Sequence, residues 1–179
     1  MAWSQILERV QSSETIWRLS VEDCIELYDN APLHPLMAAA HYRRTQHNPT
    51  NEVTYLVDRN INYTTVCTIN CQFCSFYRPP GHDETYTQSY DEIHARIDEL
   101  EGIGGSRILM QGGVNPSLEF DWYINLIKEL KDQHPSIDLD CFSPIEIEGI
   151  AEVTNLSTQE VLIRLRDAGM HGLPGGGAE

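Results

Sequence analysis

Three cysteines stand close together in the segment CTINCQFC, where three residues separate Cys67 from Cys71 and two separate Cys71 from Cys74. Thiolates are the usual ligands of iron–sulfur clusters, and a [4Fe-4S] cube ordinarily takes four of them. Because only three are grouped here, one iron would be left for a ligand from outside the protein. The spacing therefore predicts a [4Fe-4S] cluster that binds a substrate or a cofactor, and not one that only carries electrons.

A zinc site is the main alternative for these thiols. A structural zinc ion has four protein ligands and no open coordination position, and His82 could join the three cysteines as the fourth ligand. Against zinc, the RPPG spacer before His82 is poorly constrained, and the chain has no second CxxC pair. The other two cysteines are predicted to pack in a core, because Cys24 lies on one face of an expected helix and Cys141 lies within an expected strand.

The composition narrows the classes of partner. The chain has 179 residues, enough for one domain or for part of a larger one. Its 12 Lys and Arg stand against 27 Asp and Glu, a formal charge of -15, which disfavours binding to nucleic acids or anionic membranes. No stretch approaches the roughly 20 apolar residues of a membrane span, and Glu8 and Arg9 interrupt the N-terminus before a signal-like apolar run develops. We therefore expect a cytoplasmic protein with reduced thiols and no nucleic-acid or membrane partner.

The first 50 residues are expected to form a helical segment. Ser20 followed by Asp23 indicates a helix start, and a second helix is predicted over residues 33–44, before Asn48-Pro49. Residues 53–66 then predict two strands, VTYLV and INYTTV, joined by a polar DRN turn. We place the boundary between the helical segment, 1–50, and the following domain, 51–179, before these strands.

Strands and helices alternate over the rest of the chain. Capping boxes at Ser89 and Ser157 each begin a helix, another helix covers residues 123–130, and strands are expected at residues 107–110 and 137–142. A last strand is expected in the segment MHGLPGGGAE, after Gly169, where it leads into a glycine-rich loop. Such alternation predicts an α/β fold in which helices lie outside a parallel sheet. Because only about four strands are found and no helix follows the last one, we expect the first part of a parallel (βα) barrel, truncated at its C-terminus.

Ligand-binding residues of such folds lie at the carboxyl ends of the strands. The cysteine loop, Gly112-Gly113, Ser143 and residues 175–179 all follow expected strands, so we expect them on one rim. Two of these positions have simpler alternatives: Gly112-Gly113 could be a plain βα turn, and Ser143 could be a cap in the turn before Pro144. Gln111 could face either side of the sheet by parity.

Several other polar residues lie near the predicted site or on the predicted helices. Tyr77 and Arg78 follow the cysteines closely, and they could screen a cluster or bind an anionic substrate. His94 and His134 fall on an exposed helix or in a loop, and we assign them no role.

The segment CTINCQFC, with Phe73 directly before the third cysteine, resembles the Cx3CxΦC motif of the radical S-adenosylmethionine (SAM) superfamily. In that superfamily the three cysteines bind three irons of a [4Fe-4S] cluster, and the amino and carboxylate groups of SAM chelate the fourth. The resemblance therefore implies a radical SAM barrel, an oxidoreductase activity and two cofactors, the [4Fe-4S] cluster and SAM.

Longer segments narrow the resemblance. NINYTTVCTINCQFCSFYRPPGHDETYTQS, ILMQGGVNPSLEFDWY, CFSPIEI and GLPGGGAE are together similar to the cyclic dehypoxanthine futalosine synthases, which belong to menaquinone biosynthesis by the futalosine pathway. The similarity covers roughly residues 60–179. Aminofutalosine synthases and F420-type deazaflavin synthase subunits share the cysteine motif, but RPPGH, QGG and PGGGAE favour the cyclase. Val114-Asn115 departs from the pattern, where Leu-His is expected.

The resemblance also implies roles for single residues. It implies that Phe73 packs near the adenine of SAM and that Gly112 and Gly113 let its methionine moiety approach. Ser143 is predicted to face the site and to bind substrate because it lies at the end of an expected strand, and not from the resemblance. Glu179 resembles a carboxylate that accepts hydrogen bonds from the cofactor ribose; its alternative is a solvated terminal charge. On this basis a valine at Gly113 is expected to weaken SAM binding and to spare the cluster.

The implied reaction converts dehypoxanthine futalosine to its cyclic form through a 5'-deoxyadenosyl radical. The implied partners are this small-molecule substrate and an electron donor such as flavodoxin or ferredoxin. A sister radical SAM enzyme, a zinc-binding module and an inactive truncated product remain as alternatives, and we expect the 179-residue chain alone to be inactive.

Overall fold

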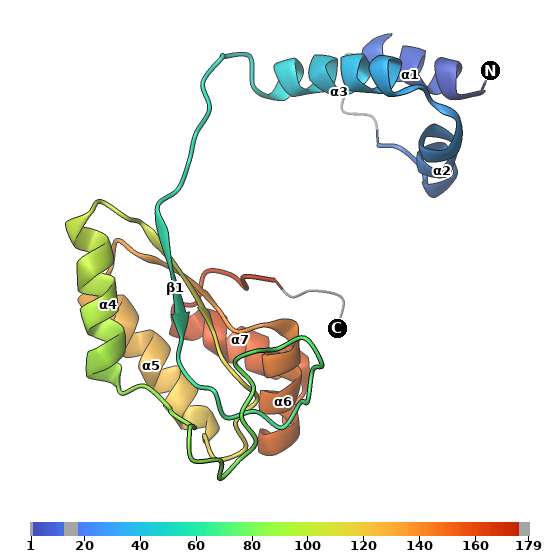
Figure 1. Ribbon diagram of the computed structural model, residues 1–179. Coiled ribbons are helices and arrows are strands. Elements are labelled where there is room, and N and C mark those ends of the chain that lie inside the picture. Colours follow the sequence, from blue (N-terminus) through green and yellow to red (C-terminus); the bar gives the residue numbers. More distant parts are fainter. Residues whose placement is uncertain (1, 13–17, 176–179) are drawn as a thin grey trace. The chain divides into compact units, whose positions relative to one another are not determined.

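The computed structural model describes residues 2–12 and 18–175 and divides into two compact units, Met1–Thr54 and Tyr55–Glu179. In its described residues the first unit consists of the helices α1 (Ala2–Ser12), α2 (Val21–Asn30) and α3 (Leu33–His47) (Figure 1). Its small core contains Ile6, Leu7, Leu27 and Ala39. The described residues of this unit are therefore mainly helical up to His47.

The helix α2 begins where the sequence predicts. The Ser20 hydroxyl accepts a hydrogen bond from the N–H of Asp23 (3.1 Å), and the Asp23 carboxylate accepts one from the N–H of Ser20 (3.3 Å), which completes a capping box. The prediction that Cys24 packs in a core is wrong, because Cys24 is exposed. This short helix buries only Leu27 within its unit, so the rest of the expected apolar side is open to solvent.

The second unit contains a parallel sheet, which confirms the predicted α/β class. Its strands are β1 (Asp58–Asn62), β2 (Arg107–Gln111) and β3 (Asp138–Cys141), in the order β1-β2-β3. The register pairs Asn62 with Gln111 and Met110 with Cys141. The carboxyl ends of all three strands therefore meet at one edge of the sheet.

The two strands predicted over residues 53–66 are replaced by the single strand β1, and that part of the prediction is wrong. Residues 53–57 are not in a strand, because no neighbouring strand pairs with them. The DRN segment is no turn but the start of β1. Both of its charged residues form ion pairs: Asp58 pairs with Arg107 of β2 (2.6 Å), and Arg59 pairs with Glu99 (2.7 Å), which lies in a helix.

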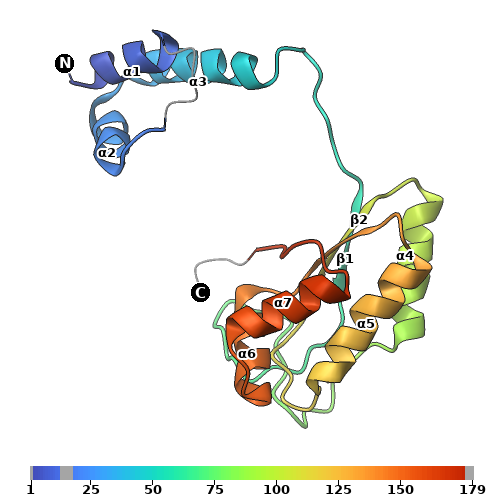
Figure 2. The same ribbon diagram turned by 180° about the vertical axis from the view of Figure 1, so that it is seen from behind.

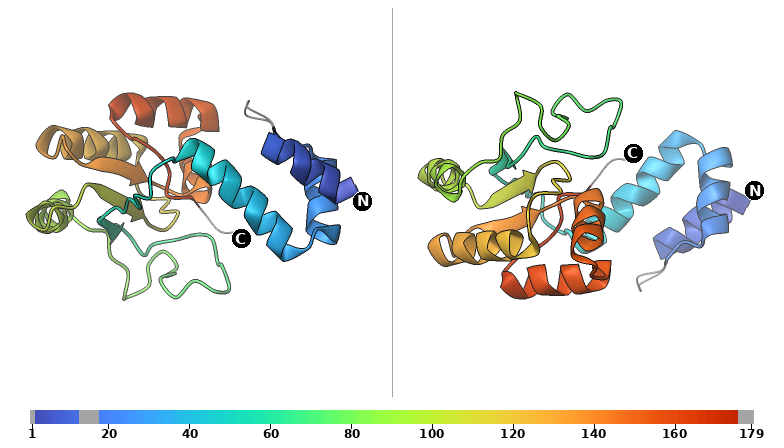
Figure 3. Two further views of the ribbon diagram at one scale, coloured as in Figure 1. Left: turned by 90° about the horizontal axis from the view of Figure 1, so that it is seen from above. Right: turned by 90° about the horizontal axis from the view of Figure 1, so that it is seen from below.

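Four helices belong to the second unit: α4 (Tyr90–Gly102), α5 (Phe120–Gln133), α6 (Pro144–Thr154) and α7 (Thr158–Ala168). The helices α4, α5 and α7 lie along one face of the sheet (Figures 1 and 2) and form an arc outside the strands (Figure 3). The capping boxes predicted at Ser89 and Ser157 are confirmed. The helix α6 was not predicted, although Ser143 and Glu146 form the same kind of box with a proline in its first turn.

The core of the second unit lies between the sheet and these helices. Ile108 and Met110 of β2 are fully buried, as are Leu139 and Cys141 of β3, so the prediction that Cys141 is a core residue is confirmed. Full burial of such an aliphatic side chain contributes about 2 kcal/mol. This layer fixes the strands whose carboxyl ends carry the candidate site.

His94 and His134 were expected on an exposed helix or in a loop, but both side chains are buried, so that expectation is wrong. They are 8% and 3% exposed, and His94 Nδ1 lies 2.9 Å from His134 Nε2. The outer nitrogens face carboxylates, with His134 Nδ1 2.9 Å from Glu101 and His94 Nε2 3.4 Å from Glu129. Because every ring nitrogen has a polar partner, the pair can be buried where α4 and α5 approach each other.

The strand expected after residue 169 is shorter than predicted. In the described residues it is reduced to one parallel bridge between Asp140 and Gly172, with the N–H of His171 donating to the carbonyl of Leu139 (2.9 Å). The chain thus returns to the free edge of β3 before it reaches Gly175.

Candidate functional site

A cavity of about 480 Å³ opens at the carboxyl ends of the strands. From the loop after β1 it is lined by Cys67, Cys71, Phe73 and Cys74, and from the ends of β2 and β3 by Gly112, Gly113 and Ser143. Gly175 also borders it, whereas Glu179 lies outside the described residues. The structure therefore brings together, on one rim, all the predicted site residues that it describes.

The cysteine loop is irregular but held by backbone hydrogen bonds. The N–H of Cys67 donates to the carbonyl of Arg78 (3.0 Å), and the N–H of Cys74 donates to the carbonyl of Cys71 (3.2 Å). The Cys67 sulfur accepts the N–H groups of Ile69 and Val114, both at 3.3 Å. These two N–H groups fix the position of the Cys67 sulfur within the loop. Cys67 and Cys71 are half-buried, and Cys74 is exposed.

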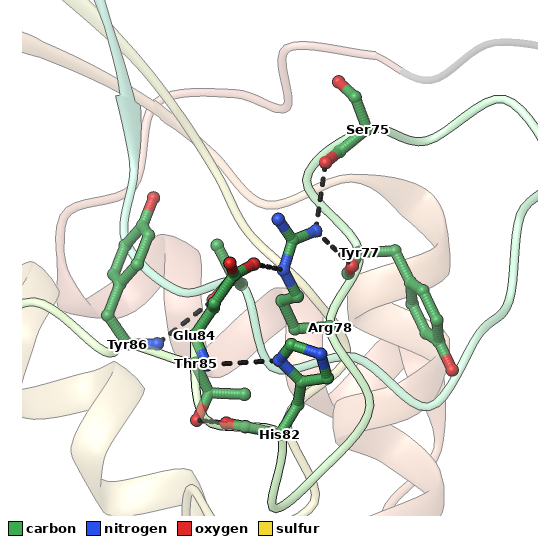
Figure 4. Close-up of polar contacts among 8 residues, drawn as sticks. Ser75, Tyr77, Arg78, His82, Glu84, Thr85 and Tyr86 are labelled. Carbon is green, nitrogen blue, oxygen red and sulfur yellow. Dashed lines mark hydrogen bonds and ion pairs between the residues drawn. The ribbon is translucent and has the colours of Figure 1, made fainter.

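Arg78 braces the loop that follows the cysteines (Figure 4). Its guanidinium donates to the Glu84 carboxylate (2.8 Å) and to the carbonyls of Ser75 (3.2 Å) and Tyr77 (2.8 Å). The His82 Nδ1 accepts the N–H of Glu84 (3.1 Å), and His82 does not line the cavity. Arg78 therefore stabilises the loop from within, and the His82 ring is used in the turn.

The spread of the three sulfur atoms bears on which metal group the loop fits. Three metal-ligating side chains whose ligand atoms all lie within 4.8 Å of one another could share one ion. Among the described residues only Asp98, Glu101 and His134 form such a group, and the three cysteines do not. A tetrahedral zinc ion with Zn–S bonds of about 2.3 Å draws its thiolates to within roughly 4 Å of one another. A [4Fe-4S] cube takes each thiolate on a different iron, which spaces them farther apart. The donor set thus fits a cluster better than zinc.

Gly112 and Gly113 lie where the end of β2 meets the cysteine loop. A Cβ atom at Gly112 would stand 2.7 Å from the Tyr63 ring, and one at Gly113 would stand 2.6 Å from the Cβ of Cys67. The N–H of Gly113 donates to the carbonyl of Thr64 (3.0 Å). The pair is therefore more than a plain turn, because only glycine permits this approach.

Ser143 combines the two roles that the sequence leaves open. It lines the cavity, and its hydroxyl accepts the N–H of Glu146 (3.3 Å) as the N-cap of α6. Gln111 faces the cavity as well, and its amide donates to the carbonyl of Gly175 (2.8 Å). Phe73 is 73% exposed at the cavity edge, open to a planar ligand.

Glu146 is a site residue that the sequence analysis missed. It is 2% exposed, and it lines the cavity beside Ser143. Burial raises the pKa of its carboxyl to about 7, although hydrogen bonds from Ser143, Tyr63 and Gly112 lower it. The signal in the sequence was the Ser-x-x-Glu spacing in CFSPIEI, which marks a helix start directly after a strand.

The described part of the cavity can hold a metal group and a ligand side by side. The loop after β1 supplies the wall with the three thiols, and the ends of β2 and β3 supply the wall with the glycine turn, Gln111 and Ser143; the two walls meet at Gly113 and Cys67. No histidine and no fourth cysteine occurs among the described lining residues. The arrangement suits a cluster that one external molecule completes.

Comparisons with known proteins agree with this geometry. The family model of the Radical SAM superfamily matches residues 61–176. The chain is 42% identical over 179 residues to the cyclic dehypoxanthine futalosine synthase of Halalkalibacterium halodurans, covering 100% of this chain and 48% of that protein. It is 35% identical over 175 residues to the aminodeoxyfutalosine synthase of Streptomyces coelicolor, covering 98% and 44% of the two chains. The chain thus spans about half the length of these curated relatives.

A solved structure shares the fold. HydG, a maturase of the [FeFe]-hydrogenase, superimposes with a TM-score of 0.60 at 14% identity, over 94% of this chain and 44% of that one. At this identity the likeness shows the architecture alone.

Proposed function

The chain belongs to the radical SAM superfamily, and from this premise we propose that it carries the cluster- and cofactor-binding part of a cyclic dehypoxanthine futalosine synthase. One observation carries the proposal: three thiols of one loop border a cavity whose described lining supplies no fourth cysteine or histidine. The whole reaction, from dehypoxanthine futalosine to its cyclic product in menaquinone biosynthesis, is only proposed, because the chain spans about half the length of the Halalkalibacterium halodurans relative.

We propose that Cys67, Cys71 and Cys74 ligate a [4Fe-4S] cluster and that SAM completes it. When bound, this pair supplies the radical chemistry that removes a hydrogen atom from the substrate. The protein's own residues bind and orient. The N–H groups of Ile69 and Val114 hold the Cys67 thiolate, and the glycine turn lets a ligand lie against backbone.

The remaining cavity residues would orient the cofactor and the substrate. We propose that Phe73 stacks on the adenine and that Glu179 binds the ribose, as the family resemblance implies. Ser143 and Gln111 present polar groups toward the cavity, suited to the hydroxyls of a nucleoside-like substrate. Phe76 and Tyr77 line the cysteine side, where they add aromatic surface beside the proposed cluster ligands.

The two residues that depart from the family pattern, Val114 and Asn115, lie in different places, one at the cavity and one in the protein interior. Val114 lines the cavity. Asn115 is 4% exposed, and its side-chain oxygen accepts hydrogen bonds from Ser117 N–H (3.0 Å) and Ser117 O–H (2.7 Å). We therefore expect the change at Val114 to bear on substrate fit, and the change at Asn115 to be accommodated by local folding.

The aminodeoxyfutalosine synthase activity is the second candidate, since a relative of that name is 35% identical. Anaerobic incubation of the protein with reductant, SAM and each substrate in turn separates the two. The proposal predicts the cyclic product from dehypoxanthine futalosine. If only the aminofutalosine product forms, the protein is an aminofutalosine synthase and the proposed cyclase activity is wrong.

We further propose a cytoplasmic location and an electron donor of the flavodoxin or ferredoxin type. None of the helices in the described ranges is long and apolar enough to cross a membrane. The net charge of -15 disfavours nucleic-acid partners. We also keep the division into a helical segment, 1–50, and a barrel part, 51–179, as a proposal.

A further inference from the structure

One buried carboxylate joins the carboxyl ends of all three described strands. Glu146 Oε1 accepts hydrogen bonds from the Tyr63 hydroxyl (2.8 Å), just after β1, and from the N–H of Gly112 (2.9 Å), just after β2. Its Oε2 accepts the N–H of Ser143 (2.7 Å), just after β3. We propose that Glu146 is a positioning residue that fixes the Gly112-Gly113 turn against the cysteine loop and so sets the shape of the rim. The proposal rests on the proposed function, in that the rim is taken to receive SAM.

The other capping boxes show that a cap alone does not need this arrangement. Glu92 and Glu160 occupy the same box position in α4 and α7, and both are exposed. Their carboxylates accept hydrogen bonds from their own Ser89 and Ser157. Capping therefore accounts for the bond from Ser143 to Glu146, but not for the burial or for the bonds from two other strand ends.

Holding Glu146 in this position costs the folded protein free energy. Burial raises the pKa of Glu146 to about 7, which means that the charged form is disfavoured there. The titratable groups around it, Tyr63, Tyr123 and Cys141, have no cationic form and so offer no countercharge; burial raises their pKa values as well and keeps them neutral. Phe142, directly before the cap, has φ +65°, a left-handed conformation that is strained for a bulky residue. Costs of this kind persist where a specific geometry is required.

A short chain of contacts leads from Glu146 to the first cysteine. The carboxylate holds Gly112, and the next residue, Gly113, packs so closely that a Cβ there would meet the Cys67 side chain. The N–H of Val114 then donates to the Cys67 sulfur (3.3 Å). A shift of the turn therefore changes both the ligand-facing backbone and the surroundings of Cys67.

The test compares Glu146→Gln with the matched control Glu160→Gln, which changes the same box position in α7, where the glutamate is exposed. A neutral amide has one oxygen, so Gln at position 146 leaves at least one N–H or O–H donor unmatched. The first readout is amide hydrogen exchange at Gly112 in the cluster-free chain. The second is the dissociation constant of SAM for the reconstituted chain, from calorimetric titration. Tyr63→Phe, which keeps the ring, provides a second variant if Glu146→Gln folds poorly.

We expect Glu146→Gln to speed exchange at Gly112 and to weaken SAM binding, each by about tenfold, as the loss of one buried charge-assisted hydrogen bond predicts. Tyr63→Phe should change both in the same direction, and Glu160→Gln should change neither. Equal exchange and equal affinity in wild type and Glu146→Gln would reduce Glu146 to an ordinary cap. If wild type fails to bind SAM while exchange at Gly112 still responds, the proposed function fails and the positioning role stands.

Discussion

The two walls of the cavity differ in how they are built. The cysteine wall is an irregular loop in which Cys74 is exposed and Phe73 and Phe76 are 73% and 57% exposed. The strand-end wall is continuous with the core, and Glu146 and Tyr63 behind it are 2% and 0% exposed. The groups proposed to carry the chemistry thus lie on the wall that solvent and ligands reach, and the groups that fix geometry lie on the buried wall.

The sharpest test of this division removes the ligands from the cysteine wall. Replacing Cys67, Cys71 or Cys74 by Ala should reduce the iron bound after anaerobic reconstitution from about four per chain to little or none, since each loss leaves only two thiolates. Cys24→Ala is the matched control, because Cys24 is exposed and distant in sequence. Iron analysis and the visible spectrum provide the readout. A normal brown chromophore in all three variants would contradict the role of this wall.

Gly113→Val tests the contact between the two walls. The sequence led us to expect weaker SAM binding with an intact cluster. The structure changes that expectation, because a Cβ at this position would stand 2.6 Å from the Cβ of Cys67. Forced overpacking of this kind costs about 1–3 kcal/mol, so we now expect less iron as well as weaker SAM binding. If the variant binds as much iron as wild type, the substitution affects SAM binding alone and leaves the cluster intact.

The buried wall should give a distinct pH dependence of stability. The pKa of Glu146 is about 7 in the folded chain against an ordinary 4.5. Folding therefore binds this proton more tightly, and the free energy of unfolding should fall as the pH rises from about 4.5 to about 7. The difference amounts to about 3 kcal/mol at about 1.4 kcal/mol for each pKa unit. Urea unfolding across this range should show the decline in wild type and, relative to it, a gain in Glu146→Gln that grows with pH. A constant difference between the two proteins would refute the buried-carboxyl account.

The smallest effect is expected for the brace of the cysteine wall. Arg78→Ala removes hydrogen bonds to Glu84 and to two loop carbonyls. Because the bond to the carboxylate is partly exposed, we expect the substitution to destabilise the folded loop by about 1 kcal/mol. The cluster should then be lost to a chelator roughly fivefold faster. Arg166→Ala, which removes an exposed pair with Asp167, is the control. Equal rates of cluster loss would show that the loop does not depend on Arg78.

The sequence predicted those parts of the molecule that depend on local pattern. The cysteine spacing, three of the capping boxes and the placing of Gly112 and Ser143 after strands all follow from residues near one another in the chain. The error over residues 53–57 has a different cause. These residues have strand propensity, but a strand also needs a neighbour, and their position relative to β2 is not written in their own sequence.

Glu146 shows why the buried wall could not be predicted in full. Its bond to Tyr63 spans 83 positions in the chain, so it arises only after β1 and β3 are placed in one sheet. The burial of His94 and His134 likewise depends on how α4 meets the end of α5, because a partner 40 positions away satisfies each ring. Contacts of this range depend on tertiary structure rather than on local pattern.

The central claim is that the three-cysteine wall holds a cluster with one iron open to SAM. The most direct measurement is the electron paramagnetic resonance spectrum of the anaerobically reconstituted and reduced chain, recorded with and without SAM. The account predicts a [4Fe-4S] signal whose g values shift when SAM is added, because the ligand binds the open iron. A signal that SAM leaves unchanged, or metal analysis that finds zinc at the cysteines, would contradict it.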